Sequence, residues 1–240
     1  MDFGLIVIAF AVFLASAFNT AFGFGGIFLL SGILAFVLPI TSVLPLQTAL
    51  MVGSQISRCM LFKSHIDWRF VRAFGLGSLI GAVPGALLYQ QISSNLITLM
   101  LAAIMLWAAW APRTGFGFTM PFGNVMTGAI HTFLSTAFSF GGLIQATVFR
   151  QGFSRTTVTA TIGLSMLVMS AFKIPAYAMT GFDYSLYLHE IMVGLIVAPF
   201  GAWVGKHLLV KMSEHLFVIA FKLLLTVAAI SLIWTVIISL

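Results

Sequence analysis

Apolar runs of about twenty residues follow one another along the whole chain, and each is long enough to cross a bilayer as a helix. Only 7% of the residues are charged, whereas a soluble domain carries about a quarter. Runs such as "LITLMLAAIMLWAAW" lack the alternation of a membrane barrel. The pattern therefore predicts an all-α polytopic membrane protein. The clear runs cover residues 43–63, 69–90, 95–111, 156–178, 186–206 and 214–238.

Two further stretches, 3–38 and 121–150, each contain a glycine motif and decide how often the chain crosses the membrane. If each were one helix, the basic residues would be split between both sides, against the positive-inside rule. If each is a hairpin that enters and leaves on one side, the loops 39–43, 91–95 and 179–185 face outward and hold no Lys or Arg. The basic residues then lie on or near the cytoplasmic side: Arg58, Lys63, Arg69, Arg72, Arg113, Arg150, Arg155, Lys206 and Lys211.

Ten crossings by short helices would place the loops on the same sides of the membrane as two re-entrant hairpins would. Segment 3–17 would rise only about 22 Å at 1.5 Å per residue, less than the hydrocarbon thickness of about 30 Å. We therefore expect deep hairpins, and about 8 to 10 membrane segments in total.

The two glycine motifs belong to an internal repeat. "FGFGG" at 22–26 and "FSFGG" at 138–142 stand 116 positions apart, inside the longer match of "NTAFGFGGIFLL" with "STAFSFGGLIQA". The matched residues are glycine or polar and stay in order, which argues against a chance match of apolar helices. The same offset pairs "IDW" at 66–68 with "FDY" at 182–184 and Pro-Gly at 84–85 with Phe-Gly at 200–201, and a small indel places Thr48 opposite Thr161.

The repeat predicts a single transmembrane domain, 1–240, built from two halves, 1–113 and 121–240. Each half is expected to hold a glycine-broken helical hairpin and three transmembrane helices. Because 39–43 lies outside and its counterpart 151–155 inside, the two repeats are expected to be inverted. Inverted repeats with interrupted helices are typical of secondary transporters.

Each glycine motif is expected to interrupt its helix, since glycine costs about 1 kcal/mol relative to alanine inside a helix. The N–H groups freed by such a break cannot stay unpaired in hydrocarbon. A helix N-terminus offers free donors and a partial positive charge, so it binds anions. We therefore expect helix starts near Gly25 and Gly141 to form a two-sided cradle for a small anion.

Hydroxyl and amide side chains beside the breaks and on the helices that follow can coordinate oxyanions without adding a permanent charge. Close helix packing, which also favours small polar residues in bilayers, is the alternative explanation for each. The candidate substrate-binding residues are Asn19, Thr20, Gly23, Gly25, Gly26, Gln47, Thr48, Gln55, Ser135, Thr136, Ser139, Gly141, Gly142 and Thr161.

Few ionisable residues fall inside the apolar segments, and each is a candidate functional group. Arg58 and Lys173 are positioned to attract anions at opposite mouths, with snorkelling to the lipid interface as the alternative. His131 is the candidate buried proton carrier, unless it is a hydrogen-bonded structural histidine. Asp67 and Asp183 are expected to be helix N-caps, so no carboxylate is placed for proton coupling.

Across almost its whole length the chain resembles the sulfite exporter TauE/SafE family of bacterial membrane permeases. The resemblance rests on a glycine-rich segment opening each half, a Thr/Ser-bearing helix after it, and the short basic loop into "DWRFVRAFGLGSLIGAVPGALL". It implies transport of sulfite, sulfoacetate or related sulfonates across the cytoplasmic membrane. Members often have three adjacent glycines, whereas Ile27 and Leu143 follow only two here. The matching positions are Gly23, Gly25, Gly26, Gly141 and Gly142, with Thr48 and Thr161 on the following helices.

The leading hypothesis is an alternating-access permease in the bacterial inner membrane, with a small anion and the lipid bilayer as partners. A passive anion channel and, less favoured, an intramembrane enzyme such as a lipid phosphatase are the alternatives, although the hairpins offer no Asp or Glu. The basic residues are scattered singly, so no nucleic-acid partner is expected. We expect no cofactor and no metal, and a homo-oligomer is left open.

Overall fold

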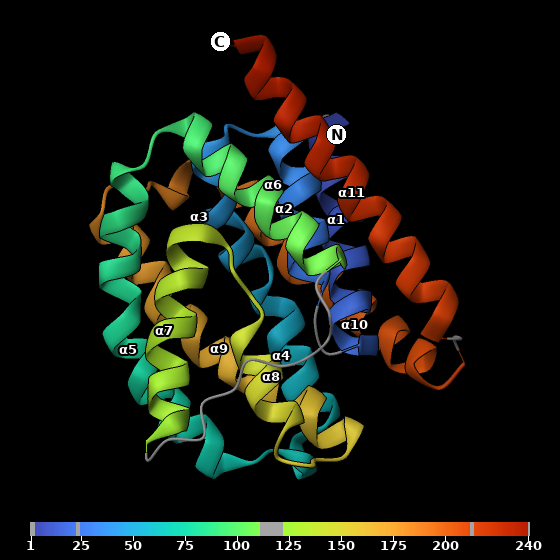
Figure 1. The fold of residues 1–240 in the computed structure, drawn as a ribbon. Helices are drawn as coiled ribbons and strands as arrows, with labels where there is room; N and C mark the ends of the chain where they lie inside the picture. Colours follow the sequence, from blue (N-terminus) through green and yellow to red (C-terminus); the bar gives the residue numbers. More distant parts are fainter. Residues whose placement is uncertain (1–2, 23–24, 111–121, 212–213, 240) are drawn as a thin grey trace.

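The computed structural model describes residues 3–22, 25–110, 122–211 and 214–239, which form helices and no strand (Figure 1). Within these ranges, four helices are long and apolar enough to cross a membrane by themselves. Shorter apolar helices accompany them, so the chain is confirmed as an all-α polytopic membrane protein. The four long spans are Phe3–Ala21, Trp68–Gln91, Thr156–Met179 and Tyr184–His207.

Both glycine motifs interrupt a helix, as expected. In the first half, the break separates α1 from α2, and three further spans follow. The described elements are α1 (Phe3–Phe22), α2 (Gly26–Val37), α3 (Ile40–Leu50), α4 (Val52–Leu61), the 3₁₀ turn η1 (Lys63–His65), α5 (Trp68–Gln91) and α6 (Ser94–Trp110).

The second half repeats this order. Its break separates α7 from α8, and α9 is continuous where α3 and α4 are divided at Met51. The described elements are α7 (Gly123–Phe138), α8 (Leu143–Phe149), α9 (Arg155–Met179), the 3₁₀ turn η2 (Tyr184–Tyr187), α10 (Leu188–Lys211) and α11 (Glu214–Ser239).

The length expected for the first helix is wrong. α1 does not end near residue 17 but continues to Phe22, so its 20 residues rise about 30 Å, enough to cross the hydrocarbon region. No glycine occurs between Gly4 and Gly23, and the residues between them extend the helix to Phe22. α2 then begins beside α1 at the level of Ala15, since a Cβ at Gly26 would overlap the Ala15 carbonyl oxygen.

Exchanging the two halves preserves the main helix contacts. α1 packs along α10, and its counterpart α7 packs along α5. α6 packs against α11, and α5 contacts α9 as α10 contacts α3 and α4. In Figure 1, α1 begins at the top near the N-terminus, whereas α7 begins at the bottom. This arrangement is typical of inverted repeats, and it holds each broken helix against the opposite half.

Glycines bring the paired helices to backbone distance. A Cβ at Gly81 on α5 would overlap the carbonyl oxygen of Ala129 on α7, and a Cβ at Gly201 on α10 would overlap that of Phe13 on α1. Such small-residue contacts allow van der Waals packing between helices in a bilayer.

The expected match of residues 84–85 with 200–201 is wrong by about one helical turn. Asp67 leads directly into α5, whereas the four residues of η2 separate Asp183 from α10. Because of this insertion Gly201 corresponds to Gly81, and the repeat offset in this helix is 120 residues rather than 116.

Basic residues gather at one end of the molecule. The turn after α4 and the connection between α8 and α9 lie at the lower end in Figure 1, and they hold the exposed Lys63 and Arg150. The connections at 38–39 and 92–93 lie at the upper end and contain no Lys or Arg.

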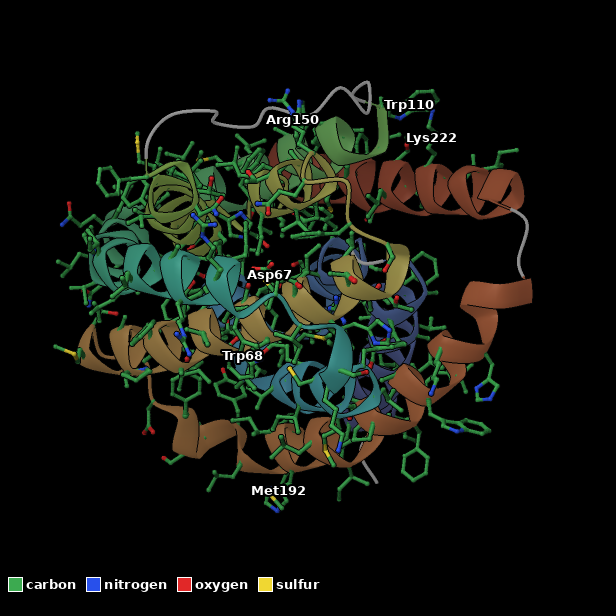
Figure 2. All side chains as sticks on the ribbon, turned by 90° about the horizontal axis from the view of Figure 1, so that it is seen from below. Asp67, Trp68, Trp110, Arg150, Met192 and Lys222 are labelled. Carbon is green, nitrogen blue, oxygen red and sulfur yellow. The ribbon has the colours of Figure 1, made fainter. Side chains whose placement is uncertain are left out.

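The outer surface is apolar. Met192 is 56% exposed and points away from the helices at the rim in Figure 2. At another edge, Lys222 and Trp110 lie together, with the Lys222 Nζ 4.8 Å from the centroid of the Trp110 ring. A Trp–Lys pair on an apolar surface suits the boundary between hydrocarbon and headgroups.

Inverted halves can be tested by labelling. In a Cys59→Ser background, Thr41→Cys and Gln151→Cys place single thiols at exposed positions at opposite ends. A membrane-impermeant thiol reagent should label the two variants from opposite sides of the membrane. Labelling of both from the same side would contradict the inverted arrangement.

Substituting a glycine at a helix contact should destabilise the fold. A Cβ at Gly128 would overlap the Phe74 carbonyl oxygen, whereas one at Gly4 has nothing within 4 Å. Gly128→Val should lower the free energy of unfolding by about 1–3 kcal/mol because the helices cannot approach. Thermal unfolding in detergent measures this effect, with Gly4→Val as the control. Equal midpoints for the two variants would contradict the contact.

Candidate functional site

The helices group into two bundles, each containing one broken helix. α1, α2, α3, α4 and α10 form what we call the first bundle, and α5, α7, α8 and α9 form the second bundle. α6 and α11 pack on each other beside them. The bundles meet chiefly where α3 and α4 contact α9.

The second break lies at this interface. Its first residue, Ser139, has a left-handed conformation with φ 61° and ends α7. The Ser139 Oγ accepts a 2.9 Å hydrogen bond from Gln47 Nε2 on α3 and lies 3.4 Å from the Ser31 Oγ on α2. Ser31 in turn donates to Gln47 Oε1. These three buried side chains therefore join the second break to the first bundle.

The two breaks lie against each other. A Cβ added at Gly141 would lie 3.3 Å from the Phe28 ring and 3.7 Å from Ile27. Both residues belong to the first turn of α2. The helix starts fall slightly later than expected, with α2 beginning at Gly26 and α8 at Leu143. A Cβ added at Gly142 would lie 3.2 Å from the indole of Trp107 on α6.

The first break is capped by its own side chain. Gly25 has φ 96°, a conformation that glycine adopts without strain. The Gly26 N–H donates a 2.9 Å hydrogen bond to Asn19 Oδ1, so one freed backbone donor of α2 is already satisfied. Gly23, also a candidate, lies outside the described residues.

Lys173 is anchored at the second break. Only 1% of its surface is exposed, and its Nζ donates to the Ser135 carbonyl oxygen at 3.2 Å and lies 3.4 Å from the Ser135 Oγ. The Tyr177 hydroxyl donates to the next carbonyl, that of Thr136, at 2.6 Å. The ammonium therefore lies at the C-terminal end of α7, where the helix dipole is negative and favours a cation.

Arg58 lies elsewhere on the same interface. It is 3% exposed, and its Nη2 donates a 3.0 Å hydrogen bond from α4 to the Thr159 carbonyl oxygen on α9. Its Nε is buried and has no partner among the described residues. Because Arg58 and Lys173 are covered by protein, neither reaches a lipid interface, and the snorkelling alternative is wrong for both.

The carboxylates of the described residues lie elsewhere. Asp67 accepts a hydrogen bond from the Phe70 N–H at 2.6 Å and Asp183 one from the Ser185 N–H at 2.9 Å, which confirms both as caps. The bonds from Ser185 hold the pKa of Asp183 below its usual value. Neither buried cation interacts with a carboxylate in the described part of the chain. The interface therefore holds two buried basic side chains and no carboxylate among the described residues, which suits an anionic ligand.

Other candidates take different places. Thr48 donates to the Leu44 carbonyl of its own helix, and Thr161 accepts from the Asp67 N–H, so neither contacts the breaks through these bonds. Thr136 donates within α7 to Thr132. Three candidates are buried with polar atoms that have no partner among the described residues: the Thr20 Oγ1, the Gln55 Oε1 and both ring nitrogens of His131.

Ser31 and Tyr177 were not among the expected site residues. The 116-residue offset aligns Ser31 with Thr147, and this recurrence of a hydroxyl in both repeats is a signal that points to Ser31. No comparable signal marks Tyr177, because its role depends on which face of α9 meets α7. No group of three His, Cys, Asp or Glu able to hold a metal occurs in the ranges that the structure describes.

The long apolar helices indicate a multi-pass membrane protein. The family model described as "Sulfite exporter TauE/SafE" matches residues 8–232, nearly the whole chain, and the chain therefore belongs to this family. It is a family of transporters and not of enzymes, so the intramembrane-enzyme alternative is set aside. Neither a curated protein nor a solved structure gives a significant match.

Substitutions at the breaks should remove anion binding. Valine at position 25 would have to adopt φ 96°, and valine at position 141 would press on Phe28. Gly25→Val and Gly141→Val should each abolish binding of the transported anion while the protein still reaches the membrane. Gly4→Val is the control, measured in the same binding assay. Full transport by both break variants would rule out the cradle.

Proposed function

We propose that the protein is a permease for small sulfur oxyanions such as sulfite, sulfoacetate or other sulfonates, and that it binds them where the two helix breaks meet. The observation that carries this proposal is Lys173, a buried lysine whose Nζ is held at the second break and has no carboxylate partner among the described residues. A buried unpaired charge is strongly unfavourable in a membrane protein. A bound anion supplies the missing counter-charge.

The chemistry around Lys173 suits an oxyanion. An ammonium has three donors, and the polar cluster of Ser31, Gln47 and Ser139 on neighbouring elements adds hydroxyl and amide donors. These neutral groups match several oxygens of one ligand. A site with one fixed positive charge binds the anion and still allows it to leave.

Alternating access would follow from movement of one bundle against the other. Near the upper end the Tyr89 hydroxyl on α5 lies 3.2 Å from the Ile40 carbonyl oxygen and 2.9 Å from that of Thr41, and these bonds join the bundles. Farther toward the basic end, the bond from Arg58 to the Thr159 carbonyl joins them again. Opening these two contacts in turn would expose the central site first to one side and then to the other.

The proposal includes location and partners. The basic end would face the cytoplasm in a bacterial inner membrane, following the positive-inside rule. The partners would be the anion and the lipid bilayer, with the inverted halves acting as a single transmembrane domain.

The proposal is tested by uptake into proteoliposomes. Sulfite, sulfoacetate, isethionate, taurine, carboxylates and chloride form the panel, and saturable uptake should be confined to one or a few sulfur oxyanions. Lys173→Met should reduce kcat/KM for that anion at least about tenfold, because a charge-assisted hydrogen bond contributes about 1.5–3 kcal/mol. Lys173→Arg should recover part of the loss.

Two controls complete this test. Lys206→Gln removes an exposed cation and should leave uptake unchanged. Counterflow of labelled anion against its gradient distinguishes a permease from a passive channel. Wild-type uptake that does not saturate, or full activity of Lys173→Met, would contradict the proposed function.

A further inference from the structure

The two buried cations lie at different levels of α9. Arg58 contacts Thr159 and Gly163, whereas Lys173 follows Gly163 by ten residues, about 15 Å along the helix. Thr159 and Gly163 are nearer the N-terminal end of α9, which is the basic end of the molecule. Arg58 therefore lies between the central site and that end.

The guanidinium of Arg58 has more donors than the described residues satisfy. It carries five N–H groups and stays charged even when buried. The bond to the Thr159 carbonyl oxygen uses one of them, while the buried Nε has no partner in the described part of the chain. With 3% of its surface exposed, Arg58 cannot compensate by contact with water or headgroups.

A glycine stands next to the unpartnered N–H. A Cβ at Gly163 would lie 3.1 Å from the Arg58 Cβ and 3.5 Å from the Nε. Because Gly163 has no side chain, the backbone of α9 approaches the Arg58 side chain closely, and any larger residue at this position would press on it. Gln55 lies three residues before Arg58, on the same face of α4, and its buried Oε1 has no partner among the described residues.

We propose that Arg58, with Gln55 beside it and the backbone of Thr159 and Gly163 opposite, forms a second anion-binding site between the two bundles. Its ligand is the sulfur oxyanion of the central site, so the inference rests on the proposed function. The guanidinium fork matches two oxygens of such an anion. The site holds the substrate between Lys173 and the basic end, and two successive sites allow binding without trapping the ligand.

The test counts anions bound to each chain. Radiolabelled sulfite is bound at equilibrium to purified full-length protein in lipid nanodiscs, and the wild type should bind two anions per chain. Arg58→Gln should bind one, with the affinity of the second site lowered at least tenfold. Gly163→Val keeps Arg58 but forces its side chain to shift, because an added Cβ would lie 3.1 Å from the Arg58 Cβ, and it should also bind one. Arg58→Lys should retain both sites, the second with reduced affinity.

Two further variants make the outcomes distinct. Lys173→Met should bind one anion, at the Arg58 site, and Arg72→Gln, which removes an exposed arginine of α5, should bind two. A single wild-type site that is lost in Lys173→Met but retained in Arg58→Gln and Gly163→Val would overturn the second site and leave the permease intact. Absence of saturable binding by the wild type would overturn both proposals.

Discussion

A positive charge enclosed in a membrane protein must meet a negative charge or a set of dipoles, and this constraint determines how Lys173 is placed. Lys173 lies at the end of α7, where the Ser135 carbonyl accepts from its Nζ and the negative end of the helix faces it. The Ser135 carbonyl also accepts from the Ser139 N–H, whereas the Thr136 carbonyl accepts from the Tyr177 hydroxyl. The helix end and the buried lysine therefore meet at the second break, where the described residues provide no carboxylate.

The packing of each half against the other brings the parts of this proposed site together. Each broken helix packs along a helix of the opposite half, and glycines such as Gly81 and Gly201 allow the backbones to touch. The second break then reaches Gln47 on α3 through Ser139. Since the proposed site is divided between two bundles, relative movement of the bundles would change access to it without unfolding either one.

Much of this structure could be predicted from local sequence signals. The apolar runs predicted the class, the glycines predicted both helix breaks, and the caps at Asp67 and Asp183 followed from residue type. The burial of Lys173 was not predictable, because it depends on the rotation of α9 against α7. The shift of α10 by four residues was missed for a related reason: η2 is a short 3₁₀ turn at the boundary between a loop and an apolar run and gives no signal in hydropathy.

The central claim is that an anion lies where the two breaks meet, beside Lys173. Diffraction from crystals soaked in selenite, a heavier analogue of sulfite, locates the anion through the anomalous signal of selenium. The account predicts a strong peak within hydrogen-bonding distance of the Lys173 Nζ and next to the Gly141–Gly142 break. Peaks confined to exposed lysines and arginines, in crystals of protein that transports selenite, would contradict it.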